Sequence, residues 1–277
     1  MHKEFIIGFI LYRPTKSTKL RIEETIKSGF SVLIYDNSPE YDIIRKHFHN
    51  HENVTYITGG KNLGLGIGLS TICSQAYYNS YKTLLFFDQD TIFATESIRF
   101  IEMYYKTNRE LFSNYSAVVF NSSGITNDDS KLDRQSEGIM SVQLVRNSGC
   151  LYNLDNLKKI NWHDTTFFVD GVDYELCLRS ACNNMLIGEC SDTPGFDHSS
   201  EQGNTPYYLF KTNHALRKYS FVRIKDTTVS SFRIIQRALF KKKYMFLKRI
   251  STLLVVYLFE QASVRIIICW RKVWGMK

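Results

Sequence analysis

The sequence predicts an α/β fold with a mostly parallel central sheet and helices on both faces. Short apolar runs alternate with helix-compatible segments through the first third of the chain. These runs are continuously apolar rather than alternating, as expected of strands covered on both faces. The chain has 277 residues, 44% hydrophobic and 22% charged, which is enough to bury a full core and argues against a disordered chain.

The first half of the chain gives the clearest alternation. We predict strands at residues 5–11, 31–35, 54–58 and 83–87, and helices at residues 15–28 and 65–78. Gly29 is a natural stop for the first helix, and the turn formers Asp36-Asn37-Ser38-Pro39 follow the second strand.

The second half is less regular. We predict helices at 95–106, 173–183 and 205–220, strands at 117–120 and 139–146, and a polar loop at 124–137. Because no long linker precedes residue 225, residues 1–225 are interpreted as one domain, followed by a helical segment at 226–277.

The net charge of +8 is concentrated at the end of the chain. Residues 233–277 hold eleven basic side chains and one acid, a net charge of +10, whereas the remainder carries −2. This distribution argues against a nucleic-acid partner. The longest uncharged stretch, residues 250–259, is shorter than the ~20 residues that a spanning helix needs. We therefore expect an amphipathic segment on an anionic membrane surface, or else helices packed on the domain or on a second subunit of a homo-oligomer.

The cysteines indicate a reducing environment. None of the six forms a CxxC pair, and most lie in apolar runs, which predicts reduced buried thiols and a cytoplasmic protein. The first apolar run is short and followed by Arg13-Pro14, which favours a strand over a signal peptide.

Polar residues follow each of the four predicted strands of the first half. They are Tyr12-Arg13, Asp36-Asn37, Gly59-Gly60-Lys61-Asn62 and Asp88-Gln89-Asp90. Ligands of open α/β sheets bind outside the carboxyl ends of the strands, so these segments predict one site.

Asp88 and Asp90 have two interpretations. Two carboxylates at this spacing can share Mg²⁺ or Mn²⁺, which leaves coordination positions open for phosphate oxygens. Alternatively, an Asp here caps the helix that follows. The buried strand before the pair favours the metal.

The glycine-rich segment Gly64-Leu65-Gly66-Ile67-Gly68 is not a dinucleotide fingerprint. Its third glycine comes one position early, and it follows the third strand rather than the first. Two interpretations of these glycines stay open: they allow close backbone contact with a nucleotide, or they allow tight packing inside the protein. The chain has no GxxxxGK[ST] motif, which excludes P-loop chemistry.

Taken together, these motifs resemble the family-2 glycosyltransferases of the GT-A fold, and within them the bacterial rhamnosyltransferase branch. The resemblance covers about residues 5–220 and rests on the order and spacing of the motifs. The matching pieces are Ile10-Leu11-Tyr12-Arg13-Pro14, Tyr35-Asp36-Asn37-Ser38, Lys61-Asn62-Leu63-Gly64-Leu65-Gly66, Phe87-Asp88-Gln89-Asp90, Asn147-Ser148-Gly149, residues 168–179, and His198.

The resemblance implies a role for each matching residue. Asp36 would accept the N3–H of a uracil or thymine ring, and Asp88 and Asp90 would hold the donor diphosphate through the metal. His198 would add a contact to the metal or the diphosphate. Asp173 would be the general base for the acceptor hydroxyl, with helix capping as its alternative role and Asp170 as the next candidate base.

The remaining expected contacts divide between donor and acceptor. Tyr12, Arg13, Asn62, Gly64 and Lys211 would bind the donor nucleotide, and the acceptor side would hold Asn147, Ser148, Gly149, Asp170 and Glu175. Two departures weaken the assignment of the donor. Lys211-Thr212-Asn213 stands where relatives often have Arg-Asn, and Gly68-Leu69-Ser70 lacks a usual second asparagine.

The sequence therefore predicts an inverting transferase that moves L-rhamnose from dTDP-L-rhamnose to a lipid-linked or growing bacterial surface polysaccharide of O-antigen or capsule type. It would act as a peripheral protein at the inner face of the plasma membrane. The alternatives are a UDP-sugar-dependent transferase (galactofuranosyl, glucosyl or N-acetylglucosaminyl) and a non-catalytic glycan-binding module. A sugar nucleotidyltransferase would need a Gly-rich basic loop after the first strand, and residues 12–15 provide none.

Overall fold

The computed structural model describes residues 3–39, 43–122, 138–193, 196–198, 207–208 and 215–273. The chain divides into two compact units: Met1–Phe168 with Val172–Ser199, and Val169–Gly171 with Ser200–Lys277. The polar loop expected at 124–137 lies outside the described residues.

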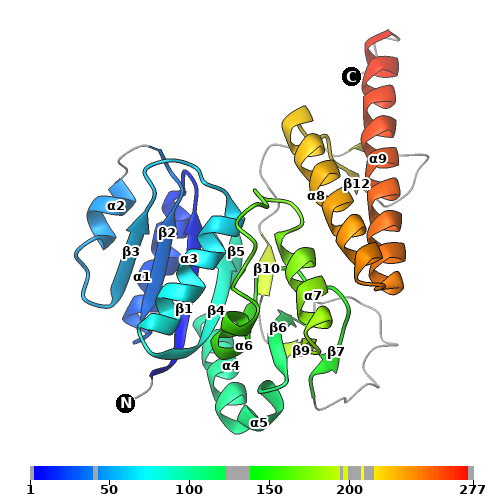
Figure 1. Cartoon of the computed structure of the whole chain (residues 1–277). Coiled ribbons are helices and arrows are strands. Elements are labelled where there is room, and N and C mark those ends of the chain that lie inside the picture. Colours follow the sequence, from blue (N-terminus) through cyan, green and yellow to red (C-terminus); the bar gives the residue numbers. More distant parts are fainter. Residues whose placement is uncertain are drawn as a thin grey trace. The chain divides into compact units, whose positions relative to one another are not determined.

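The first unit is built on an eight-stranded sheet in the order β3-β2-β1-β4-β8-β6-β9-β7 (Figure 1). Neighbouring strands are parallel from β3 to β4 and between β6 and β9, and antiparallel where β8 joins β4 to β6 and where β7 joins β9. Its strands are β1 (Lys3–Leu11), β2 (Val32–Asp36), β3 (Val54–Thr58), β4 (Tyr81–Asp88), β6 (Tyr115–Ser122), β7 (Met140–Ser141), β8 (Cys150–Asn153) and β9 (Leu186–Thr193).

Seven helices and a small two-stranded sheet complete the described part of this unit. The helices are α1 (Lys16–Lys27), α2 (Ile43–Phe48), α3 (Leu65–Tyr78), α4 (Thr95–Thr107), α5 (Arg109–Phe112), α6 (Leu154–Lys159) and α7 (Val172–Cys182). The second sheet pairs β5 (Thr91–Phe93) with β10 (Phe196–His198) in antiparallel fashion.

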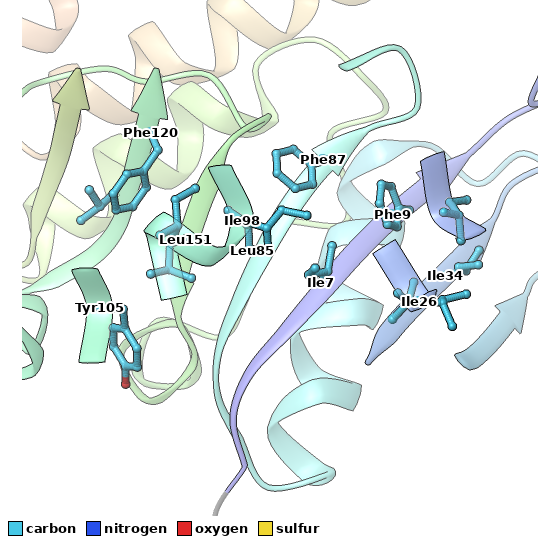
Figure 2. Close-up of a cluster of buried hydrophobic side chains, with 14 of the residues drawn as sticks. Ile7, Phe9, Ile26, Ile34, Leu85, Phe87, Ile98, Tyr105, Phe120 and Leu151 are labelled. Carbon is cyan, nitrogen blue, oxygen red and sulfur yellow. The ribbon is translucent and has the colours of Figure 1, made fainter. Parts of the chain in front are cut away.

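Alternate residues of β1 face the two layers of helices. Ile7 and Phe9 lie in a buried cluster with Ile26 of α1 and Ile98 of α4 (Figure 2). On the other face a Cβ added at Gly8 would lie 2.9 Å from Ile72 of α3. Helices therefore cover both faces, as the continuously apolar strand runs predict. The predicted α/β fold is confirmed.

Two predicted elements of the second half are wrong. Of the strand expected at 139–146, only Met140–Ser141 is a strand, paired with β9, and the last bond to β9 is from the Val142 N–H to the Ile187 carbonyl at 2.9 Å. The helix expected at 205–220 is replaced by β11 (Tyr207–Tyr208) paired with β12 (Ala215–Leu216). A helix instead begins after Ser220, whose side chain accepts a hydrogen bond from the Arg223 N–H and caps it.

The second unit contains the β11–β12 pair and two long helices, α8 (Phe221–Phe240) and α9 (Tyr244–Val273). Ile234 and Ala238 of α8 are buried, as are Ile250, Leu254 and Val264 of α9. The predicted domain boundary at residue 225 falls inside α8. A boundary between independently folding domains stays a prediction.

Helix α9 is apolar on its outer side as well as on its packed side. Val255, Phe259, Ile266 and Trp270 are exposed. By length and composition, the stretch Tyr244–Trp270 could cross a membrane: its apolar 18-residue window has a mean hydropathy of 1.7 and is 22% buried. The sequence analysis took the uncharged stretch 250–259 as too short to span a membrane. Helix α9 continues on both sides of that stretch, so its length does not exclude a spanning helix.

Candidate active site

The carboxyl ends of β1, β2 and β4 meet at one edge of the sheet. In the strand register Leu11 lies opposite Asp36, and Ile10 lies opposite Asp88. The two aspartates therefore flank the end of β1, which is the convergence that the sequence predicts.

The middle residue of the Asp88-Gln89-Asp90 segment is held from two sides. Its side chain accepts a hydrogen bond from the Tyr12 N–H at 2.8 Å and donates one to the Tyr12 carbonyl at 3.1 Å. Its carbonyl accepts from the Arg21 guanidinium at 2.5 Å and from the Thr18 hydroxyl at 3.2 Å. The loop between the two aspartates is thus tied to both β1 and α1.

Arg21 is a site residue that the sequence analysis missed. Burial lowers the pKa of its guanidinium, and the nearby carboxylates of Asp90 and Glu24 oppose that shift. The sequence could have indicated Arg21 by its spacing: it lies one turn after Thr18, on the same face of the helix that follows the first strand. This cation lies close enough to Asp90 to influence any ligand bound there.

Asp88 and Asp90 do not cap a helix. A strand, β5, follows them directly, and the N-cap of α4 is Ala94, which makes no side-chain capping bond. The capping alternative is therefore wrong for this pair.

The Asp88 carboxyl group has an unusual titration. Burial, followed by the charges of Asp90 and Asp173, raises its pKa from 3.8 to about 7. Three carboxyl groups thus interact at this strand end. Carboxylate oxygens are the ligands that hard divalent cations prefer, and a bound positive charge would offset this repulsion.

The described residues contain no group of three His, Cys, Asp or Glu side chains arranged to hold a metal ion. His198, the further ligand expected from the resemblance, lies opposite Thr91 in the β5–β10 register, one residue beyond Asp90. Its side chain lies outside the described parts of the structure. Metal binding at Asp88 and Asp90 stays a prediction.

Asp36 lies buried at the end of β2, and both of its oxygens have partners. One accepts the Ser38 N–H at 2.8 Å, and the other accepts the Tyr56 hydroxyl. Tyr56, the middle residue of β3, is a second residue that sequence reasoning missed. A carboxylate oxygen can accept more than one hydrogen bond, so Asp36 keeps capacity for a base N–H.

Next to Asp36, Asn37 joins β2 to the glycine-rich loop. Its amide donates to the Gly64 carbonyl at 3.2 Å and accepts from the Leu63 N–H at 3.0 Å. Within the loop, the Asn62 side chain accepts the Gly64 N–H at 3.0 Å. Asn62 and Asn37 therefore shape this loop from inside.

The glycines of this loop allow two parts of the chain to approach closely. A Cβ at Gly64 would lie 2.5 Å from the Phe168 carbonyl oxygen, and a Cβ at Gly66 would lie 2.4 Å from that of Phe167. The Leu65 N–H donates to the Phe168 carbonyl. The geometry favours the packing interpretation of these glycines, and the expected contact of Gly64 with a nucleotide is untested.

Asn147, Ser148 and Gly149 lie beside the end of β4. The Ser148 hydroxyl accepts the Asp88 N–H at 3.1 Å, and the Gly149 N–H donates to the Phe86 carbonyl at 2.8 Å. The Asn147 amide oxygen accepts the Tyr152 hydroxyl at 2.8 Å. The segment expected on the acceptor side thus supports the strand that carries Asp88.

Asp173 is the second residue of α7, and its carboxylate accepts the N–H of Tyr174 at 2.9 Å. It lies close enough to Asp88 to raise the pKa of that carboxyl. Glu175 is 2% exposed and forms a salt bridge with Arg179 at 2.8 Å. Arg179 also donates to the Ile160 carbonyl, so Glu175 serves a buried tie between α7 and the end of α6.

Of the remaining expected residues, Tyr12 is exposed and Arg13 adopts a left-handed φ of 49°. The Arg13 N–H donates to the Ser38 hydroxyl at 2.8 Å, which links the ends of β1 and β2. Asp170 belongs to the second unit. Lys211 lies outside the described residues.

No protein-family model and no curated protein matches the sequence. Solved structures of S. aureus TarS match the fold. The complex with UDP-GlcNAc aligns with a TM-score of 0.55 and 13% identity over 94% of this chain and 73% of that chain. The complex with UDP aligns with a TM-score of 0.51 and 14% identity over 70% and 59%.

A further TarS structure aligns with a TM-score of 0.52 and 14% identity over 71% of this chain, which spans only 37% of the length of that one. Identity at this level is informative about architecture alone. The chain shares the α/β fold of TarS, with the central sheet flanked by helices that the sequence predicts.

Proposed function

We propose that the protein is a glycosyltransferase that uses a nucleotide-sugar donor. The observation that carries the proposal is the convergence of Asp36 and Asp88 at the carboxyl ends of β2 and β4, with Asp90 on a loop tied to β1 and α1. The fold shared with TarS, which binds UDP and UDP-GlcNAc, supports it. A diphosphate and its metal are the ligand that such a carboxylate group would take.

In this proposal Asp88 and Asp90 hold Mg²⁺ or Mn²⁺. The ion would supply positive charge to the donor diphosphate as it leaves. Arg21 is held beside Asp90 and would keep the loop in place. His198, through its backbone position next to Thr91, is the candidate for a further contact.

The proposed reaction is a single displacement with inversion. Asp173 takes the proton from an acceptor hydroxyl while the acceptor oxygen forms its bond to the anomeric carbon of the sugar. The bond from that carbon to the diphosphate oxygen breaks, and the nucleoside diphosphate leaves with the electron pair. A positioned base of this kind contributes about 10²–10⁴ in rate.

The donor base is proposed to be uracil or thymine, bound through its N3–H by Asp36. The two bases differ by a methyl group away from that N–H, so Asp36 serves both. L-Rhamnose from dTDP-L-rhamnose stays our proposal from the sequence resemblance. A UDP-sugar is the second candidate because TarS was solved with UDP and UDP-GlcNAc.

The outer side of α9 is proposed to contact an anionic membrane, with a lipid-linked oligosaccharide as acceptor. Its exposed Val255, Phe259 and Ile266 form an apolar stripe with Lys248 and Trp270 towards its ends. Basic residues on an apolar surface are attracted to anionic lipid by roughly 1 kcal/mol each. This would place the protein at the inner face of a bacterial plasma membrane.

Contacts in the middle of α9 favour lying on a membrane over crossing it. The buried side chain of Gln261 accepts the Tyr219 N–H at 3.1 Å and donates to the Arg217 carbonyl at 2.9 Å. Arg265 donates to the Tyr219 carbonyl at 2.9 Å. Crossing a bilayer would break these bonds and leave polar groups in hydrocarbon.

Vesicle binding tests the membrane contact. The intact chain should float with anionic vesicles and not with neutral ones, and a variant with Ser at Val255, Phe259, Ile266 and Trp270 should not float. Equal flotation of both proteins would contradict the proposal. If that face instead contacts a second copy, the same variant would change the mass in solution and leave flotation unchanged.

A thermal-shift screen tests the donor. UDP-, dTDP- and GDP-sugars are added with and without Mn²⁺ to the wild type and to Asp90→Asn. Uracil or thymine donors should stabilise the wild type, more strongly with Mn²⁺, and the variant should lose the Mn²⁺ effect. Stabilisation by GDP-sugars alone would contradict the role of Asp36.

A further inference from the structure

The Tyr56 side chain reaches the end of the neighbouring strand. In the register of β2 and β3, Tyr56 lies opposite Ile34, two residues before Asp36. Side chains alternate along a strand, so Ile34 and Asp36 share one face of the sheet and Tyr56 is the diagonal neighbour of Asp36. An aromatic side chain can span this diagonal, and the Tyr56 hydroxyl donates a hydrogen bond to one oxygen of Asp36.

The Asp36 carboxylate is held by two separate parts of the chain. One oxygen accepts the Tyr56 hydroxyl from β3, and the other accepts the Ser38 N–H at 2.8 Å from the turn that follows β2. Asp36 is 2% exposed, so water has little access to these bonds. Hydrogen bonds to a carboxylate are charge-assisted and roughly twice as strong as neutral ones. Together the two bonds fix the plane of the carboxylate.

The Tyr56 ring is itself supported. It is half-buried and packs against the hydrophobic cluster that contains Ile34. The His49 ring lies beside it, with 6.2 Å between the ring centroids and an angle of 47° between the ring planes. Packing on the cluster and beside His49 limits the rotation of the ring, so its hydroxyl meets Asp36 from a fixed direction.

An oriented carboxylate favours the binding of a base. A carboxylate oxygen can accept more than one hydrogen bond, so an incoming N–H does not have to displace the Tyr56 hydroxyl or the Ser38 N–H. A group that is already oriented loses less conformational entropy when its ligand binds. Without the Tyr56 hydroxyl, one of the two bonds that fix the carboxylate is lost, and Asp36 can turn about its Cβ–Cγ bond.

We propose that Tyr56 is a positioning residue that orients Asp36 to accept the N3–H of a uracil or thymine base. The inference rests on the proposed function of Asp36. It assigns part of the selectivity for the donor to β3, the strand beside the one that carries Asp36. The effect falls on donor binding rather than on transfer, because Tyr56 acts at the base and not at the bond that breaks.

The test compares Tyr56→Phe with the wild type, because phenylalanine keeps the ring and removes only the hydroxyl. The probe is UDP or dTDP, whichever binds the wild type more tightly. Its Kd and the KM of the corresponding donor should rise about 3–10-fold, with kcat within about 2-fold of the wild type. The matched control is Tyr77→Phe, which removes a hydroxyl that accepts the Lys158 ammonium at 3.0 Å near the last residue of α3 and should match the wild type.

The N3-methyl derivative of the same nucleotide separates the orientation of Asp36 from general damage to the site. It has no N3–H, so its bond to Asp36 is absent in both proteins, and Tyr56→Phe should leave its Kd within about 2-fold of the wild type. An equal loss of affinity for the nucleotide and for its N3-methyl derivative would overturn the proposal. A Kd of the unmethylated nucleotide within about 2-fold of the wild type would also overturn it.

Failure of the proposed role of Asp36 gives a different result. The wild type would then bind the nucleotide and its N3-methyl derivative equally, or bind neither, which overturns the inference together with the function on which it rests. If the wild type prefers the unmethylated nucleotide and Tyr56→Phe keeps the same preference, only the role of Tyr56 fails.

A second measurement keeps the hydroxyl and applies if Tyr56→Phe does not fold. A fluorinated tyrosine replaces Tyr56 alone, and its fluorine NMR signal is followed as nucleotide is added. The unmethylated nucleotide should shift this signal more than the N3-methyl derivative, because only the former adds a hydrogen bond to the carboxylate that the hydroxyl contacts. Equal shifts by the two nucleotides would overturn the proposal.

Discussion

Gln89 and Tyr12 exchange two hydrogen bonds, which lock the loop between Asp88 and Asp90 to the end of β1. We predict that Gln89→Ala loosens this loop and lowers kcat about 10-fold, since both aspartates lose their fixed spacing. Steady-state kinetics of donor turnover would measure the effect. Gln75→Ala, which removes a glutamine hydrogen bond to Asn79 on α3, is the control and should leave kcat unchanged.

The raised pKa of Asp88 predicts how stability depends on pH. The folded protein holds this proton more tightly than the unfolded chain, so without metal the protein loses stability as the pH rises from 3.8 to about 7. Asp88→Asn removes this titration. Its Tm should therefore fall less than that of the wild type between pH 5 and about 8.

The same titration predicts the pH dependence of metal binding. Mn²⁺ requires the ionised carboxylate, so it should raise the Tm of the wild type more above pH 7 than below it, and should not raise that of Asp88→Asn. Parallel pH profiles for the two proteins, with and without Mn²⁺, would contradict the raised pKa.

Gly66→Ala tests the packing role of the glycine-rich loop. Its new methyl group would lie 2.4 Å from the Phe167 carbonyl oxygen and 2.7 Å from that of Asp164, and backbone gives way only at a cost. We expect a loss of about 1–3 kcal/mol in the free energy of unfolding. Gly68→Ala meets the movable end of Ile10 at 2.9 Å and should cost less in the same urea titration.

Glu175 should matter for stability more than for acceptor binding. Removing one partner of a buried ion pair leaves the other charge uncompensated and typically costs about 3–5 kcal/mol. Because Arg179 is part-exposed, water will reduce this cost. We therefore expect Glu175→Ala to lower the free energy of unfolding by about 3 kcal/mol or less. An unchanged stability together with a raised acceptor KM would instead support the acceptor role that the sequence resemblance implies.

The sequence was most informative where structure depends on local pattern. The residues of β3 and α3 match the prediction to the residue, and α1 (Lys16–Lys27) lies within the helix predicted at residues 15–28. The strand ends at Asp36 and Asp88 followed from the same pattern. The pairing of β8 between β4 and β6, and of β11 with β12, depends on partners distant in the chain, which a local pattern does not encode.

The same distinction applies to the site. Sequence spacing located the carboxylates, but not what holds them, because Arg21, Tyr56 and Ser148 reach the strand ends through long-range contacts. It also did not anticipate that Asp170 and Glu175 would have their carboxylates engaged within the protein. Their partners, Thr227 and Arg179, are visible only once the helices are placed.

The most direct test of the central claim is nucleoside diphosphate release from UDP- and dTDP-sugars by the wild type and by Asp173→Asn. Water serves as the acceptor, so no acceptor sugar has to be known. We predict that both proteins bind the same donor with similar Kd and that the variant releases product about 10²–10⁴ times more slowly. Equal release by the two proteins, or no binding of either donor class to the wild type, would contradict the account.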